Sequence, residues 1–151
     1  MEQHGRLFRP MILHDLAATE TLAQRLARLA RPGDALLLSG PLGAGKSALA
    51  RAFLRALLGD PALEAPSPSY TLVQSYAVPG GGQAHHFDLY RLGGAEEVLE
   101  LGWEEALEGI VLVEWPERLG ALAPAGALRI VLTPLDEDGR EALLTGWEGR
   151  L

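Results

Sequence analysis

The sequence predicts an α/β fold in which helices flank a mainly parallel sheet and antiparallel hairpins extend that sheet. Three observations support this prediction. A glycine-rich loop at 40–47 stands between a short apolar strand and an amphipathic helix, the order of elements in a strand–loop–helix unit. A second apolar run, 110–113, ends in an acid, as expected of a buried parallel strand that ends at a ligand site. Apolar segments on both sides of the turn sequences at 79–82 and 136–139 predict two hairpins.

The first forty residues predict a strand, a helix and a second strand. Residues 8–13 are apolar enough for a strand. A leucine stripe with helical spacing predicts an amphipathic helix that starts at Asp15 or Thr19, either of which could cap it, and ends at Arg31. The stripe consists of Leu22, Leu26 and Leu29. A Pro-Gly pair then turns the chain into a buried strand at 35–38.

The loop that follows matches the phosphate-binding pattern G-x-x-x-x-G-K-[ST] at every fixed position. Its residues are Gly40, Pro41, Leu42, Gly43, Ala44, Gly45, Lys46 and Ser47. The glycines allow several backbone N–H groups to point at one phosphate, while Lys46 supplies a charge for the outer phosphates and Ser47 a hydroxyl for Mg²⁺. Lys46 is also the only lysine of the chain. The pattern and its flanks predict a P-loop NTPase fold; the alternative is a glycine-rich turn without a ligand.

The middle of the chain predicts a helix, a loop and a hairpin. Residues 47–58 have an apolar face with helical spacing, and Gly59 ends that helix. Residues 65–69 are too proline-rich for a helix or a central strand and predict a loop. Residues 70–78 and 84–90 alternate like strands around a proline and three glycines, which predicts the first hairpin.

The last third predicts two short helices, a buried strand and a second hairpin. Residues 95–107 are acidic on one side, and Gly102 divides them into two helices. The strand at 110–113 follows. Residues 128–132 and 142–145, around the turn 136–139, predict a hairpin that closes the edge of the sheet.

Two acids are candidates for chemistry beside the phosphate loop. Glu114 directly follows the buried strand, the position at which an α/β sheet places ligand-binding groups. Asp88 lies in a strand and would face the rim of the sheet if its apolar neighbours face inward; an ordinary surface or strand-end carboxylate is the alternative. The adjacent His85 and His86 point to opposite faces of a strand, so they form no two-ligand metal site and are interpreted as structural. The hydroxyl-rich segment 67–71 is a candidate switch or a merely connecting loop.

Length and composition limit the classes of protein to which the chain could belong. The chain has 151 residues, of which 48% are hydrophobic. This length is enough for one core, so we expect residues 1–151 to form a single domain. The chain has no apolar run near the length of a membrane span and no signal-like start, so we expect a cytoplasmic protein without membrane contact. The absence of cysteine excludes disulfides, thiolate metal sites and cysteine nucleophiles. A net charge of −7 argues against a nucleic-acid-binding surface.

Four motifs in this order, in a chain of this length, resemble the TsaE (YjeE) family of bacterial ATPases. They are the loop at 40–47, Ser67-Pro68-Ser69-Tyr70-Thr71-Leu72-Val73, His86-Phe87-Asp88-Leu89-Tyr90-Arg91 and Val113-Glu114-Trp115-Pro116. The resemblance implies a P-loop ATPase that uses ATP and Mg²⁺. It also implies partners, a complex with TsaB- and TsaD-type subunits that forms threonylcarbamoyladenosine beside the anticodon of tRNA. The acidic chain would contact tRNA only indirectly.

The same resemblance implies a role for individual residues. The loop at 40–47, with Lys46, would hold the phosphates, Ser47 and Glu114 would hold Mg²⁺, and Asp88 would assist hydrolysis. Lys46, Asp88 and Glu114 are thus the expected catalytic residues. Further nucleotide contacts are expected from Ala48, Trp115, Thr19 and Arg140. Residues 67–71 would form the mobile loop, in which Ser69 stands where the family usually has threonine; the hydroxyl is kept.

Three other functions are alternatives to this ATPase. A GTPase would need an Asn-Lys-x-Asp or Thr-Lys-x-Asp motif for guanine, and the chain has no asparagine and no second lysine. A small-molecule kinase usually closes an arginine-bearing lid, and the arginines after the loop form no cluster in one candidate lid. A nucleotide-dependent docking switch with little turnover would use the same binding residues as an ATPase, and only turnover stimulated by a partner would separate the two.

Overall fold

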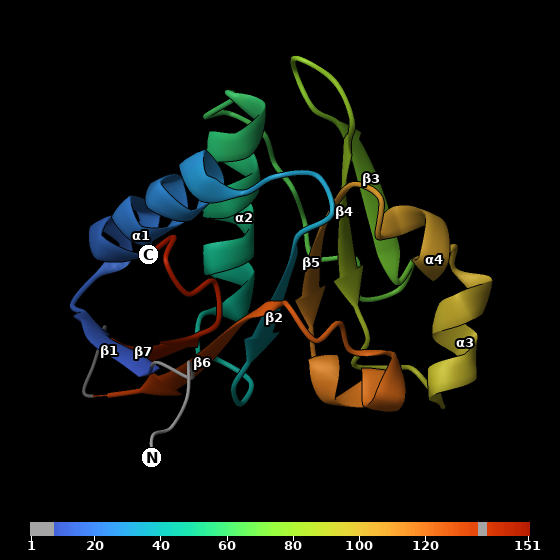
Figure 1. The fold of residues 1–151 in the computed structure, drawn as a ribbon. Helices are drawn as coiled ribbons and strands as arrows, with labels where there is room; N and C mark the ends of the chain where they lie inside the picture. Colours follow the sequence, from blue (N-terminus) through green and yellow to red (C-terminus); the bar gives the residue numbers. More distant parts are fainter. Residues whose placement is uncertain (1–7, 136–138) are drawn as a thin grey trace.

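The computed structural model describes residues 8–135 and 139–151 (Figure 1). Helices flank one mixed β-sheet. The strands are β1 (Phe8–Leu13), β2 (Ala35–Ser39), β3 (Val73–Ala77), β4 (Gln83–Asp88), β5 (Ile110–Glu114), β6 (Leu128–Pro134) and β7 (Arg140–Thr145). The helices are α1 (Leu16–Leu29), α2 (Lys46–Leu58), α3 (Ala95–Glu100), α4 (Trp103–Ala106) and the 3₁₀ helix η1 (Pro116–Leu122).

The sheet is parallel at its centre and antiparallel at both ends. The order of its seven strands is β1-β7-β6-β2-β5-β4-β3. β2 pairs in parallel with both β6 and β5, and β5 pairs in parallel with β4. The pairs β1–β7, β7–β6 and β3–β4 are antiparallel. The predicted parallel core with antiparallel hairpins is therefore confirmed, but half of the pairings between described strands are antiparallel, so the sheet is mixed rather than mainly parallel.

Alternate residues of the central strands face two separate apolar cores. Leu36 and Leu38 of β2 pack with α1 and α2, whereas Leu37 packs on the opposite face with α3, α4 and η1. This division follows from the two-residue period of a strand, because neighbouring side chains point to opposite faces. Figure 1 shows α1 and α2 on one side of the molecule and α3 and α4 on the other. The central strands are thus covered on both faces, as parallel strands require.

Several predicted boundaries shift by a few residues for local reasons. Asp15 caps α1, because its side chain accepts a backbone N–H of the first turn at 2.9 Å; Thr19 lies within the helix. The helix ends at Leu29 rather than Arg31, since a proline follows Arg31 and disfavours helical backbone before it. Residues 70–72 form a turn outside β3, and η1 has no counterpart among the predicted elements.

The prediction that the C-terminal hairpin closes the sheet edge is wrong. The hairpin exists as β6 and β7, but β1 pairs with the outer side of β7 and forms the edge. This pairing joins residues 8–13 to residues 140–145, a separation that no local sequence pattern reports. Positions 136–138 of the predicted turn lie outside the described residues. No helix in the described part of the chain has the length and apolarity needed to span a membrane.

Candidate functional site

The loop between β2 and α2 leaves the carboxyl end of a central parallel strand. Gly45 is the N-cap of α2, and within the described ranges no side chain caps the first turn of this 13-residue helix. Gly45 has a φ of +99°, in the left-handed region that favours glycine. The free N–H groups and the positive end of the helix dipole are a favourable environment for an anion.

Lys46, the first residue of α2, is held against the loop that precedes it. Its ammonium donates hydrogen bonds to the carbonyl oxygen of Gly40 and, at 3.0 Å, to that of Pro41. The same nitrogen lies 4.0 Å from the centroid of the Trp115 ring. The side chain is only 5% exposed. Desolvation lowers the pKa of Lys46, against the opposing effect of nearby carboxylates, chiefly that of Glu114.

Glu114 ends β5 and is bound through both of its carboxylate oxygens. Oε1 accepts a hydrogen bond from the Ser47 hydroxyl at 3.0 Å, although 67 residues separate the two in sequence. Oε2 lies 2.7 Å from Nε2 of His86 in β4. The carboxylate is nearly inaccessible, with Glu114 2% exposed. A hydroxyl from the helix and a carboxylate from the sheet are therefore brought together beside the loop.

Asp88 ends β4 and lies next to Glu114 in the register of the sheet. Its Oδ2 accepts hydrogen bonds from the hydroxyls of Ser67 at 2.8 Å and Ser69 at 3.1 Å, and its Oδ1 accepts one from the backbone N–H of Tyr90 at 3.1 Å. Asp88 is 4% exposed, so the alternative of an ordinary surface carboxylate is wrong. The acid is a buried group that fixes the proline-rich loop to the sheet.

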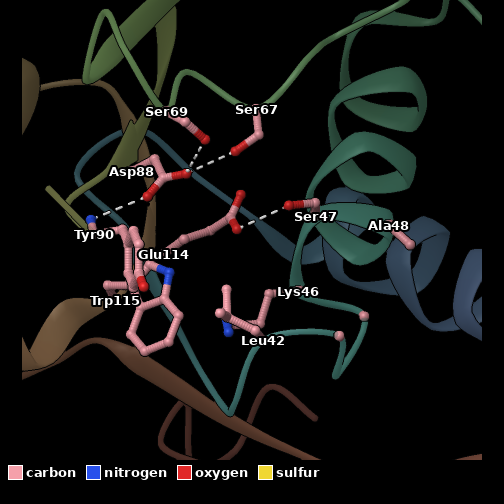
Figure 2. Close-up of a pocket in the computed structure, with 12 residues that line it drawn as sticks. Leu42, Lys46, Ser47, Ala48, Ser67, Ser69, Asp88, Tyr90, Glu114 and Trp115 are labelled. Carbon is pink, nitrogen blue, oxygen red and sulfur yellow. Dashed lines mark hydrogen bonds between the residues drawn. The ribbon is translucent and has the colours of Figure 1, made fainter.

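These groups share one cavity of about 390 Å³ at the carboxyl edge of the sheet. Figure 2 shows its lining, with the Asp88 and Glu114 carboxylates between the serines of the proline-rich loop and the start of α2. The residues that line it are Leu42, Gly43, Gly45, Lys46, Ser47, Ala48, Ser67, Ser69, Asp88, Tyr90, Glu114 and Trp115. One wall is aromatic, because the rings of Tyr90 and Trp115 lie 5.0 Å apart between centroids.

Other predicted site residues do not line this cavity. Among described residues, the lining does not include Gly40, Pro41 or Ala44 of the loop. Arg140 of β7 supports the loop from behind, since its Nη1 donates to the carbonyl oxygen of Ala44 at 3.1 Å. Thr19 is 1% exposed within the first turns of α1 and does not line the cavity. Nucleotide contacts by Arg140 and Thr19 stay predictions.

Sequence reasoning gave no site role to His86 or Tyr90. A usable signal was present for His86, because it stands two residues before Asp88 and residues two apart on a strand share a face. The face that carries Asp88 also carries Ala84, which packs in the core beneath α1 and α2. Tyr90 lies beyond the end of β4, and its approach to Trp115 depends on how β4 and β5 pair.

The sequence matches known proteins over most of its length. The model of the TsaE family, described as threonylcarbamoyl adenosine biosynthesis protein TsaE, matches residues 13–142. A Rickettsia felis protein is 38% identical over 131 residues, which are 86% of this chain and 75% of that protein. A Bacillus subtilis protein is 34% identical over 129 residues, 84% of this chain and 78% of that protein. Both relatives are named tRNA threonylcarbamoyladenosine biosynthesis protein TsaE.

The fold also matches a solved structure. The crystal structure of Bacillus subtilis YdiB superposes with a TM-score of 0.77 at 28% sequence identity, and the match covers 98% of this chain and 91% of that one. The similarity therefore includes both layers of helices and the whole sheet rather than the phosphate-loop unit alone.

Proposed function

The chain belongs to the TsaE family of threonylcarbamoyl adenosine biosynthesis proteins, and from this premise we propose that it is a P-loop ATPase. It binds and hydrolyses ATP with Mg²⁺ to support a protein complex that forms threonylcarbamoyladenosine in tRNA. The observation that carries the proposal is the hydrogen bond between Ser47 and Glu114, because it joins the phosphate loop to an acid at the end of a buried parallel strand.

The phosphates of ATP would be bound by the loop at 40–47. The uncapped start of α2 provides backbone donors, and Lys46 can exchange its two carbonyl partners in the loop for phosphate oxygens. Burial supports this exchange, because a desolvated ammonium gains more from a phosphate than a fully hydrated one. Trp115 and Tyr90 provide an aromatic wall beside the phosphate site.

Mg²⁺ would be bound by Ser47 and Glu114. Both groups provide the oxygen ligands that this ion prefers, and ligands about 2.0–2.1 Å from the metal at right angles are about 2.9 Å apart. The Ser47 Oγ and Glu114 Oε1 atoms are 3.0 Å apart, so the donor pair fits. Within the described residues, no group of three or more His, Cys, Asp or Glu side chains could hold a metal. The remaining ligands of Mg²⁺ would be oxygens of phosphate and water.

Asp88 is the proposed group that assists hydrolysis. It lies beside Glu114 at the cavity, and its carboxylate is oriented by two serine hydroxyls and a backbone N–H. A carboxylate in this position can orient a water molecule for attack on the terminal phosphate. The loop that carries Ser67 and Ser69 would then respond to what occupies the site, because it shares that carboxylate.

The proposed partners are the TsaB- and TsaD-type subunits of a threonylcarbamoyl-transfer complex. The relatives bear names from this biosynthesis, and the net charge of −7 supports an indirect relation to tRNA, since phosphate contacts call for a basic surface. A docking switch with little turnover would use the same cavity, and a small-molecule kinase would need an acceptor site in addition.

The test is ATP hydrolysis by the purified protein, alone and with the TsaB–TsaD-type complex. Lys46→Ala should lower nucleotide affinity about 10- to 100-fold, as expected when hydrogen bonds to a charged group are removed, and should abolish stimulation by the partner. Arg28→Ala, on the exposed face of α1, is the matched control for loss of a cation and should behave like the wild type.

Other outcomes would refute the site or favour a different function. Unchanged nucleotide affinity of Lys46→Ala would refute the site. Binding without stimulated turnover would favour the docking switch, and phosphate transfer to a metabolite without partner proteins would favour the kinase.

A further inference from the structure

His86 is a buried titratable residue that touches the proposed magnesium site without facing the cavity. It is 1% exposed, and its Nε2 lies 2.7 Å from Oε2 of Glu114. We propose that His86 is a positioning residue: it fixes the carboxylate of Glu114 so that the opposite oxygen faces Ser47 and Mg²⁺. This inference rests on the proposed function, because it concerns the metal of the same site.

The position of His86 follows from the pairing of β4 with β5. In this parallel pair His86 is opposite Leu112, and Asp88 is opposite Glu114. His86 and Asp88 therefore lie on one face of β4, two residues apart, and their neighbour on β5 is the end residue Glu114. Asp88 binds the proline-rich loop, whereas the imidazole of His86 contacts Oε2 of Glu114.

The hydrogen-bond partners of the ring indicate its tautomer. An ionised carboxylate can only accept, so Nε2 of His86 carries the proton that binds Oε2 of Glu114. Nδ1 is buried and has no hydrogen-bond partner among the residues that the structure describes. A proton on Nδ1 would leave a buried donor unsatisfied, which costs more than an unused acceptor. The geometry therefore places the proton of this hydrogen bond on Nε2.

Glu114 needs such a partner because a carboxylate is not oriented by its own side chain. The last torsion of glutamate joins sp³ and sp² atoms and has a broad energy profile. The Ser47 hydroxyl binds only Oε1, and this bond is the one that Mg²⁺ would replace. His86 binds Oε2, and this bond can persist when the metal is bound. Partners of this kind typically change metal affinity 10- to 100-fold when they are removed.

The experiment is a Mg²⁺ titration of nucleotide binding by calorimetry, with a non-hydrolysable ATP analogue. His86→Phe keeps a ring in the buried space but has no donor, whereas His86→Gln places an amide N–H near the position of Nε2. We expect His86→Phe to lower the affinity for Mg²⁺ about 10- to 100-fold. The affinity for the analogue in EDTA should stay within about twofold of the wild-type value. His86→Gln should restore Mg²⁺ affinity to within a few-fold of wild type. Glu114→Gln is the positive control for loss of the metal.

A second measurement reads the tautomer in the wild-type protein, and a variant is needed only to assign the signal. Nitrogen-15 spectra of histidine side chains separate a ring protonated at Nε2 from one protonated at Nδ1, and His86→Gln identifies the signal. A ring without a proton on Nε2, or unchanged Mg²⁺ affinity in His86→Phe, would overturn the inference and leave the ATPase proposal standing. If His86→Phe lost the same affinity for the analogue in EDTA as in Mg²⁺, the inference would also be overturned, since this would indicate a general structural role. A wild-type protein that binds no nucleotide would overturn both proposals.

Discussion

Two features of the structure favour glycine at position 45. Its φ of +99° is one that side chains rarely adopt, and a Cβ built there would lie 1.6 Å from Nη1 of Arg140. Arg140 is in turn bound to the carbonyl oxygen of Ala44. The strand β7 thus supports the loop from behind, at the place where the loop joins α2. Gly43 offers a contrast, because its φ is +81° and nothing lies within 4 Å of its Cβ position.

We predict that Gly45→Ala destabilises the protein more than Gly43→Ala does. Gly43→Ala should lower the free energy of unfolding by about 1–2 kcal/mol, the cost of left-handed backbone in a residue with a side chain. Gly45→Ala should lower it by about 1.5–3 kcal/mol more, because Arg140 must give up its hydrogen bond to the loop. Urea unfolding monitored by circular dichroism measures both. Two results would contradict this account. One is an equal loss of unfolding free energy in both variants, and the other is a Gly45→Ala loss that is just as large in an Arg140→Ala background.

Single residues also show how far a sequence pattern identifies a site. Lys46 and Ser47 belong to a motif whose spacing carries their chemistry, and Glu114 could be located because it follows a buried apolar run. For His86 the sequence indicates a face shared with Asp88 but not a role, because its partner Glu114 is 28 residues away and on another strand. The period of a strand tells which face His86 occupies, but only the pairing of strands tells what lies there.

At the level of elements, the segment between α2 and β3 is fixed to the sheet through one carboxylate. Within this segment, the stretch 65–72 begins at Ala65 and ends at Leu72, whose φ values of +42° and +72° are ones that favour glycine. Between them, the hydroxyls of Ser67 and Ser69 bind Asp88. The loop keeps this shape because hydrogen bonds to a buried acid offset the backbone strain at its ends.

We predict that Ser67 and Asp88 are energetically coupled. Ser67→Ala should cost about 1–3 kcal/mol of unfolding free energy, since it removes a donor to a buried carboxylate. In a double-mutant cycle with Asp88→Asn, the coupling energy should be about 0.5–3 kcal/mol. Ser75→Ala is the matched control, because Ser75 is hydrogen-bonded to His85 instead and should show no coupling to Asp88. Additive effects of Ser67→Ala and Asp88→Asn would mean that the loop is held by other contacts.

On the scale of the whole molecule, the C-terminal segment fastens α1 to the start of β2. The guanidinium of Arg150 binds the carboxylate of Asp34 at 2.7 Å and 3.2 Å, and it also donates to the backbone carbonyl of Leu29. It stacks on Trp147, with its central carbon 4.1 Å from the ring centroid. Figure 1 shows the C-terminus beside α1, so the residues that follow β7 lie close to a helix that is far from them in sequence.

We predict that Arg150→Ala lowers the free energy of unfolding by about 1–3 kcal/mol without changing nucleotide affinity. The loss arises because a partly buried ion pair is broken, which leaves Asp34 with the backbone N–H of Arg31 but without the guanidinium. Arg129→Ala removes an exposed arginine from β6 and should change stability by less than about 0.5 kcal/mol. Thermal unfolding and calorimetric titration with ATP measure the two quantities. A loss of nucleotide affinity equal to the loss of stability would show that the C-terminal segment also shapes the cavity.

The sequence by itself determined the parallel core, the phosphate loop, the two acids and most of the elements, because these depend on periodicities and spacings within a few residues of one another. It also carried the resemblance to the TsaE family, which the comparisons confirm. Only the tertiary structure decided that β1 forms the sheet edge, that Arg140 lies against Gly45, and that His86 binds Glu114. The physical reason is that each of these contacts joins segments far apart in the chain, and their energies depend on strand register and burial, which no local pattern encodes.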